Sequence, residues 1–260
     1  MIEVQGVQRR FVQGRGRRER VVQAVAGADF VAADGCITGL LGSNGAGKTT
    51  TLRMVAALLG ADAGQIRVDG IDVAKQPAAA LARLGVLSDA RGLYPRLTAR
   101  ENIVYFARLH GLSDEAAQQR TEALARTLEL QPLLDRRTEG FSQGERMKTA
   151  LARALVHDPP NIILDEPTNG LDVMATRALR RALQRLRDDE GKCIVFSTHV
   201  MQEVERLCDH VVVMAAGRTV AQGRVGELCA RCGTPDFEQA FVALAFAAPL
   251  DADPATEIAS

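Results

Sequence analysis

GSNGAGKT, residues 42–49, is the stretch of sequence that decides the fold of this chain. It matches the phosphate-loop pattern G-x-x-x-x-G-K-[ST], whose glycines let the backbone turn tightly and aim successive N–H groups at phosphate oxygens. The apolar run 37–41 precedes it and the helix-forming residues 50–55 follow it. Because the order is strand, glycine loop and helix, as this motif requires, the sequence predicts a nucleoside triphosphate site.

The residues of this loop have separate expected roles. Lys48 is placed to reach the terminal phosphates, and Thr49 is placed to ligate Mg²⁺. The N-terminus of the following helix adds a partial positive charge of roughly half a unit. We therefore predict ATP and Mg²⁺ as cofactors, with the nucleotide bound by Gly42, Ser43, Asn44, Gly45, Ala46, Gly47, Lys48, Thr49 and Thr50.

The composition describes a globular protein without a dominant charge. Of the 260 residues 47% are hydrophobic, ample for a buried core, and 32 basic residues balance 32 acidic ones. This balance gives no global argument for nucleic acid as a partner. The longest apolar run, 240–250, is far too short to span a bilayer. We do not expect secretion, because the first residues do not combine a basic region with an apolar stretch. We expect a cytoplasmic protein whose work at a membrane needs another chain to do the spanning.

The chain changes character along its length. Residues 2–41 have β patterns interrupted by a basic loop at 13–20, which predicts an antiparallel β region. From Thr98 the pattern is helical, because Thr98 and Glu101 form a capping box. We expect a helical subdomain over about 98–157, inside an ATPase domain at 1–232. A C-terminal helix and flexible tail are expected at 233–260.

Two carboxylates follow a short apolar strand in the second half of the chain. Asp165 stands at the end of the strand 161–164, where it is placed to hold Mg²⁺ through water beside Thr49. Glu166, one residue on, points elsewhere and is free to act on a water molecule. A second apolar strand, 193–196, follows an arginine-rich helix, and this alternation indicates a largely parallel sheet.

Four further motifs separate this chain from kinases, small GTPases and recombinases, which also carry phosphate loops. They are FSQGE at 141–145, the Asp-Glu pair at 165–166, GLD at 170–172 and STH at 197–199. Together with the phosphate loop, these motifs resemble those of the ATP-binding subunit of an ABC transporter, over roughly residues 1–230. The resemblance implies an α/β fold with a RecA-like P-loop NTPase core, an N-terminal antiparallel β subdomain and an inserted α-helical subdomain.

The resemblance also implies how the site works. A signature formed by Ser142, Gln143, Gly144 and Glu145 would bind the γ-phosphate held by a second ATP-binding subunit, so a homodimer is expected. His199 would hydrogen-bond the γ-phosphate and hold Glu166 and water in line. Phe11 matches the aromatic residue that stacks on adenine.

One position departs from the family pattern. Most members carry a glutamine after the strand that follows the phosphate-loop helix, and it contacts Mg²⁺ and senses the membrane subunit. Asp89 stands at that position here, and a carboxylate can also ligate Mg²⁺ through water. The following run, 90–98, resembles the corresponding region in subunits that serve sodium-efflux and drug-efflux exporters.

We therefore predict an ATPase that powers a separate integral membrane permease, with export as the direction of transport. The protein would lie on the inner face of the cell membrane, held there by the permease. A soluble ABC ATPase acting on nucleic acid or ribosomes is the alternative, but such proteins usually carry two nucleotide modules or a long coiled-coil insertion. A non-hydrolytic nucleotide-binding regulator is disfavoured by Glu166 and His199.

Overall fold

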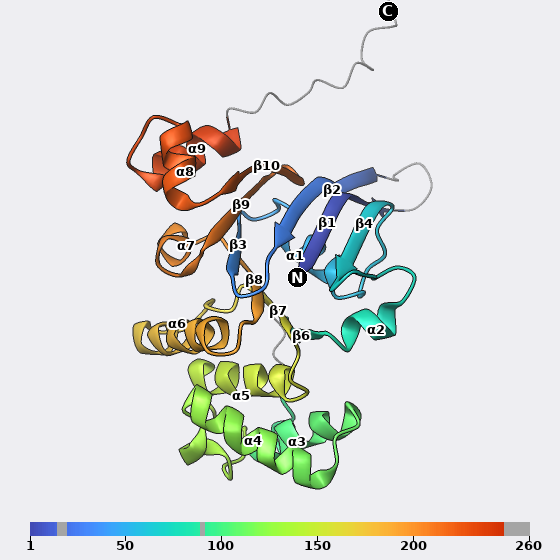
Figure 1. Cartoon of the computed structure of the whole chain (residues 1–260), viewed down its shortest axis with the longest axis vertical. Coiled ribbons are helices and arrows are strands. Elements are labelled where there is room, and N and C mark those ends of the chain that lie inside the picture. Colours follow the sequence, from blue (N-terminus) through green and yellow to red (C-terminus); the bar gives the residue numbers. More distant parts are fainter. Residues whose placement is uncertain (15–19, 89–91, 247–260) are drawn as a thin grey trace, which may run out of the picture.

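The computed structural model of the chain describes residues 1–14, 20–88 and 92–246 (Figure 1). Three expectations fall on other positions and so lie outside the described residues. They concern most of the basic loop, Asp89 and the tail beyond residue 246. Within the described ranges, no helix combines the length and the apolar character needed to cross a membrane.

The strands of the described residues join into one ten-stranded sheet with the order β5-β4-β1-β2-β10-β9-β3-β8-β7-β6. Their bounds are β1 (Ile2–Gln13), β2 (Arg20–Ala32), β3 (Ile37–Leu41), β4 (Ala63–Val68), β5 (Ile71–Asp72), β6 (Leu84–Leu87), β7 (Asn161–Asp165), β8 (Cys193–Thr198), β9 (His210–Ala215) and β10 (Arg218–Gly223).

The half of the sheet from β9 to β6 is parallel. β3 pairs with both β8 and β9, and β7 pairs with both β8 and β6. Every residue of β3, β7 and β8 is buried, as is typical of parallel strands covered on both faces. The parallel sheet expected from the alternation of strands and helices is therefore confirmed.

The other half of the sheet is mainly antiparallel. β1 pairs antiparallel with β2 and β4, and β4 pairs antiparallel with β5. β1 and β2 precede the phosphate loop, as predicted. β4 and β5 follow the loop in the sequence and were not predicted, because the chain returns to this half of the sheet only after the first helix.

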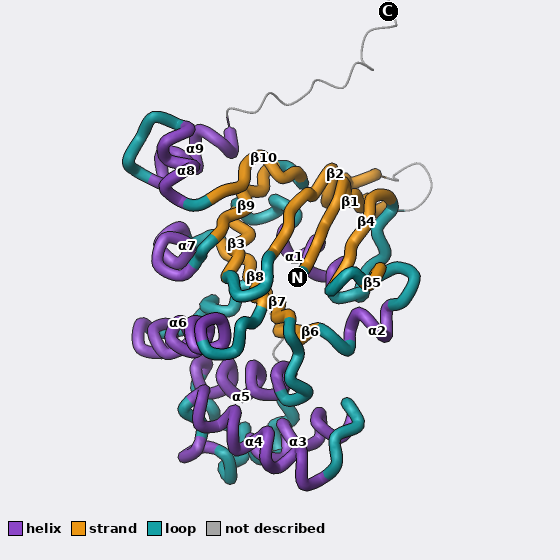
Figure 2. The backbone as a smooth tube through the Cα atoms, viewed as in Figure 1, coloured by secondary structure: helices purple, strands orange, loops and turns teal. Residues whose placement is uncertain are grey.

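The helices lie around the sheet and beyond it at both ends of the molecule (Figure 2). Their bounds are α1 (Lys48–Val55), α2 (Pro77–Leu81), α3 (Ala99–Leu109), α4 (Asp114–Leu128), α5 (Gln143–Leu155), α6 (Val173–Asp188), α7 (Met201–Leu207), α8 (Val225–Arg231) and α9 (Phe237–Phe246), with a short 3-10 helix, η2, at Gln131–Leu133. The helices α3, α4 and α5 gather at one end of the molecule, and α8 and α9 lie at the other.

Three buried clusters hold these layers together. One joins α3, α4, α5 and α6 to the strands β7 and β8, with Ile103, Leu151, Leu183 and Phe196 among its members. A second packs α1 against the antiparallel strands. The third joins α7, α8 and α9 to β9, so α9 packs on the core although it lies beyond residue 232.

The capping box predicted at Thr98 begins α3. Thr98 Oγ1 accepts the backbone N–H of Glu101 at 3.1 Å, and Glu101 Oε2 accepts the backbone N–H of Thr98 at 2.7 Å. These two bonds satisfy N–H groups that the first turn of a helix leaves without partners. Because α3 packs against both α4 and α5, its first turn fixes where the helical end of the molecule starts.

We expect Thr98→Ala to lower the free energy of unfolding by about 1 kcal/mol, because the substitution removes the N-cap acceptor. Urea denaturation measures the change. Thr127→Ala is the matched control, since the Thr127 hydroxyl donates only to the Ala123 carbonyl inside α4. Alanine favours a helix interior, so the control should lose less than about 0.5 kcal/mol. Equal losses in the two variants would contradict the role of the cap.

Candidate functional site: a phosphate loop beside two strand-end carboxylates

The phosphate loop connects the end of β3 to the start of α1. Gly47 is the N-cap residue of α1, and its φ of 96° is in the left-handed region that favours glycine. A Cβ atom added to Gly47 would lie 2.7 Å from the Ala24 carbonyl oxygen in β2. The last glycine of the motif is therefore required by the backbone conformation and by the close approach of β2.

Lys48 is held at the mouth of this loop. Its Nζ donates to the carbonyl oxygens of Gly42 at 2.8 Å and Ser43 at 3.2 Å, and its side chain is only 5% exposed. The same Nζ lies 3.5 Å from Glu166 Oε1. A buried ammonium group at the N-terminus of a helix, which favours negative charge, is suited to phosphate oxygens.

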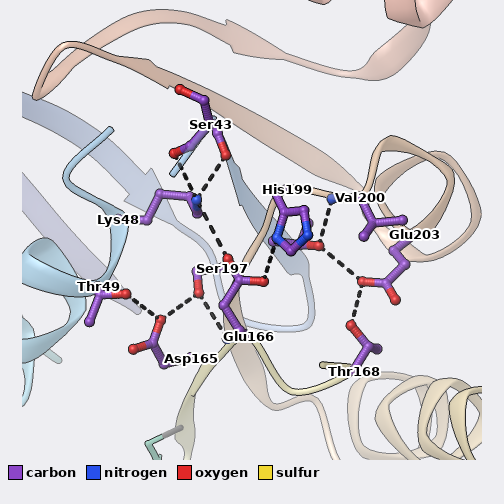
Figure 3. Close-up of polar contacts among 12 residues, drawn as sticks. Ser43, Lys48, Thr49, Asp165, Glu166, Thr168, Ser197, His199, Val200 and Glu203 are labelled. Atoms are coloured by element: carbon purple, nitrogen blue, oxygen red, sulfur yellow. Dashed lines mark hydrogen bonds and ion pairs between the residues drawn. The ribbon is translucent and has the colours of Figure 1, made fainter. Parts of the chain in front are cut away.

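Asp165 lies beside the phosphate loop, as predicted. Its Oδ1 accepts hydrogen bonds from Thr49 Oγ1 at 3.0 Å and from Ser197 Oγ at 2.7 Å (Figure 3). The residue is buried and ends β7. A hydroxyl and a carboxylate side by side are oxygen ligands of the kind that Mg²⁺ prefers, so the donor set fits this ion.

Glu166 leaves the strand in an unusual conformation. Its φ of 45° is left-handed, and its backbone N–H donates to Ser197 Oγ at 2.9 Å. Ser197 therefore bonds to both carboxylate residues, to the side chain of Asp165 and to the backbone of Glu166. This role of Ser197 was not predicted from the sequence, where the residue is only one member of the STH motif. Its place next to His199 was the one sequence signal for it.

His199 and Glu166 face each other across the site. His199 Nδ1 lies 3.0 Å from Glu166 Oε2, while the other carboxylate oxygen of Glu166 lies near Lys48. The Glu166 side chain is 17% exposed and that of His199 is 47% exposed. The predicted pairing of these two residues is present in the single chain.

A pocket of about 430 Å³ lies over these groups, a volume typical of small-ligand sites. Three residues of β2 and Asn169, none of them predicted, also line it. The predicted residues among its lining are Asn44, Gly45, Ala46, Gly47, Lys48, Thr49, Thr50, Glu166 and His199. Gly42 and Ser43 reach this group through the hydrogen bonds of their carbonyls with Lys48.

Phe11 does not line this pocket, although it lies close by. It pairs across the β1–β2 hairpin with Val22, which does line it. The guanidinium carbon of Arg9 lies 5.2 Å from the centroid of the Phe11 ring. The assignment of Phe11 as the adenine-stacking residue stays a prediction. The assignment of Asp89 as a Mg²⁺ ligand also stays a prediction, because Asp89 lies outside the described residues.

The signature residues are not brought to the phosphate loop of their own chain. Ser142 is the N-cap of α5 and forms a capping box with Glu145, a pattern that the sequence contains and the analysis missed. The hydrogen bond from the Ser142 backbone N–H is the main cause that lowers the pKa of the Glu145 carboxyl. Gln143 instead lines a separate cavity of about 580 Å³, together with Asn169 and Gly170.

Gly144 is closely packed against α6. A Cβ atom added to Gly144 would lie 2.9 Å from the Cβ of Ala175. The signature, α6 and the segment 169–170 therefore lie next to one another. Asn169 lines both the 580 Å³ cavity beside Gln143 and the phosphate-loop pocket.

Comparison with known protein families shows which family has this combination of motifs. The pattern of the family described as "ABC transporter" matches residues 25–169, more than half of the chain. This chain belongs to the ABC transporter family. The ABC transporter ATP-binding protein NatA of Bacillus subtilis is 43% identical over 88% of this chain and 91% of that protein. The Nod factor export ATP-binding protein I of Paraburkholderia xenovorans is 41% identical over 79% of this chain and 67% of that protein.

Solved structures of the ABC transporter family share the fold. An ATP-binding subunit of an ABC transporter has a TM-score of 0.80 at 28% identity, covering 94% of this chain and 98% of that one. The dimeric cassette MJ0796 has a TM-score of 0.77 at 23% identity, covering 86% and 98%, which shows the fold alone. The predicted α/β fold with a RecA-like core is confirmed, and the chain is an ATP-binding subunit of the ABC transporter family.

We expect Ser197→Ala to lower the free energy of unfolding of the nucleotide-free protein by roughly 1–3 kcal/mol, because the buried Asp165 carboxylate loses a donor and the part-buried N–H of Glu166 loses its acceptor. Thr219→Val is the matched control. The Thr219 hydroxyl also accepts a backbone N–H, from Asp29 at 3.1 Å, but this bond is exposed and water can replace it. Urea denaturation should therefore show a smaller loss in the control, and equal losses would contradict the buried role of Ser197.

Proposed function

We propose that this chain hydrolyses ATP and that the hydrolysis drives transport through a separate integral membrane permease. The observation that supports hydrolysis best is the contact between Glu166 and His199 next to Lys48. A carboxylate that faces the phosphate site is suited to accept a proton from an attacking water. The histidine holds this carboxylate on the side away from Lys48, so its orientation is fixed before a nucleotide binds.

Binding and base function are divided between different residues of the site. Lys48 and the N–H groups of the phosphate loop bind the phosphates, and Thr49 and Asp165 hold Mg²⁺. When bound, the ion neutralises charge on the phosphate oxygens. Glu166 and His199 act on water at the pocket opening. Ser197 connects the two functions, since it bonds to Asp165 and to Glu166.

A second copy of the chain completes the site in this proposal. None of the signature residues lines the phosphate-loop pocket of their own chain: Gln143 lines another cavity, and Ser142 is the N-cap of the helix α5. A helix N-terminus favours negative charge, so the signature of one copy suits the γ-phosphate bound by the other. The neighbour MJ0796 is described as a dimer, which supports the same arrangement for this chain.

The relatives support a role in export. One of them is named as a Nod factor export protein, and by analogy we propose export here, with the chain on the cytoplasmic face of the membrane next to the permease. The soluble alternative, acting on nucleic acid or ribosomes, predicts no such partner. Co-purification of the chain with a polytopic membrane protein would separate the two proposals.

Glu166→Gln should bind ATP with nearly unchanged affinity but hydrolyse it at least ~100-fold more slowly, the usual scale for the loss of a general base. The amide keeps the shape of the side chain and loses the proton acceptor. Steady-state phosphate release and ATP binding by titration calorimetry measure the two effects.

Glu190→Gln is the control for this substitution, because it removes an exposed carboxylate whose nearest cation is Lys192 at 3.6 Å. It should hydrolyse ATP at the wild-type rate. Near wild-type turnover by Glu166→Gln would show that Glu166 is not the base.

Shared sites predict complementation between two inactive variants. Lys48→Ala should lose phosphate binding, and Ser142→Arg should block the partner's site with a bulky cation, so each variant alone should be inactive. In a mixture, the hybrid dimer contains one intact composite site, and part of the ATPase activity should return. The measurement is the ATPase rate across a range of mixing ratios. Absence of recovery at every ratio would contradict independent shared sites.

A further inference from the structure

Glu203 is a buried carboxylate that the proposed chemistry does not use. It lies in α7 and is 9% exposed. Its Oε2 accepts two hydrogen bonds, from Thr168 Oγ1 at 2.8 Å and from Thr198 Oγ1 at 3.0 Å. An ionised side chain is costly to bury, so a carboxylate in this place needs such donors.

Both donors lie within two positions of Glu166 or His199 in the sequence. Thr168 follows Glu166 by two positions, and Thr198 directly precedes His199. The hydroxyl of Thr198 also accepts the backbone N–H of Val200 at 3.0 Å. The residues directly before and after His199 are therefore bonded to each other. Figure 3 shows this second group of contacts beside the Glu166–His199 contact.

We propose that Glu203 is a positioning residue that sets the distance between His199 and Glu166. The proposal rests on the ATP hydrolysis argued above. Glu203 is absent from the lining of the phosphate-loop pocket, so it acts through the two threonines. Because one oxygen atom accepts both hydroxyls, the segment after Glu166 and the segment around His199 are held at a fixed separation.

The turn after Glu166 explains why the separation between this segment and the segment around His199 has to be fixed by side-chain bonds. Glu166 has a left-handed φ, and the chain then turns, with the Asn169 N–H donating to the Glu166 carbonyl at 3.1 Å. This segment lies beyond the end of β7 and therefore lacks ladder hydrogen bonds. Thr168 connects it to α7 instead. A misplacement of about 1 Å at a reacting group can cost up to ~100-fold in rate, so loss of this connection should reduce turnover.

The test compares three full-length variants. Glu203→Ala removes the shared acceptor, and Glu203→Gln keeps a carbonyl oxygen that can accept both hydroxyls. Glu205→Ala is the matched control, because it removes an exposed carboxylate from the same helix. We expect kcat for ATP to fall at least ~10-fold in Glu203→Ala, with the Kd for ATP within about twofold of wild type. Glu203→Gln should stay within about threefold of wild type, and Glu205→Ala should match it.

Thermal melting identifies variants that fail to fold, and Thr168→Val keeps the proposal testable in that case. It removes one hydroxyl with little change of shape and should lower kcat several-fold while the Kd for ATP is kept. Adding Thr168→Val to Glu203→Ala should cause no further loss, because the acceptor is already gone.

Three outcomes would overturn the proposal. They are turnover of Glu203→Ala within twofold of wild type, an equally slow Glu203→Gln, and additive losses in the double variant. A change in melting temperature with unchanged kcat belongs to the first outcome, and would assign Glu203 a purely structural role. Failure of the proposed function is distinct, since the wild-type protein and Glu205→Ala would then also show no hydrolysis above that of Lys48→Ala.

Discussion

The register of three adjacent parallel strands is the constraint on which the site depends. β8 lies between β3 and β7, with Thr198 opposite Leu41 and Ser197 opposite Asp165. Parallel strands in register end at the same edge of a sheet, where ligands of open α/β folds bind. The phosphate loop, the two carboxylates and the switch histidine therefore meet because each directly follows, or ends, one of these strands. A slip of one residue in β8 would turn Ser197 away from Asp165.

Sequence analysis predicted this meeting of motifs but not the bonds that hold it. Apolar runs predicted β3, β7 and β8. The phosphate-loop motif predicted Lys48, the strand end predicted Asp165 and Glu166, and the family resemblance predicted His199. Ser197 and Glu203 were missed because each bonds to the segment after β7, more than 30 residues away, and no sequence pattern distinguishes a buried bridging serine or glutamate from an exposed one. Only the register and the burial assign these roles.

The antiparallel half of the sheet and the signature were each predicted incompletely, for different reasons. β4 and β5 were missed because the chain returns to the antiparallel half of the sheet only after the phosphate-loop helix, and no local pattern indicates that return. The helical part was predicted well, because its capping box and apolar spacing are local signals. Which copy of the chain the signature serves is not a local property. Motif spacing contains no information about the second protomer, so Ser142 enters the proposal through resemblance and through its place outside the pocket.

The proposed site has two parts. One is the pair of strand-end residues held by Ser197, and the other is the signature at the start of α5. Ser197 bonds to Asp165 and Glu166 from a fully buried strand, and these bonds offset the left-handed backbone of Glu166, which costs on the order of 1–3 kcal/mol. The signature lies at the start of α5, where Gly144 packs against Ala175 and Gln143 lies near Gly170, while the apolar residues farther along α5 join the buried core. Residues 166–170 connect the two, because they begin at Glu166, the proposed base, and end at Gly170 beside Gln143 of the signature. Thr168 lies in the middle of this segment, so its bond to Glu203 fixes the segment at the point where a shift of the signature surface would reach Glu166.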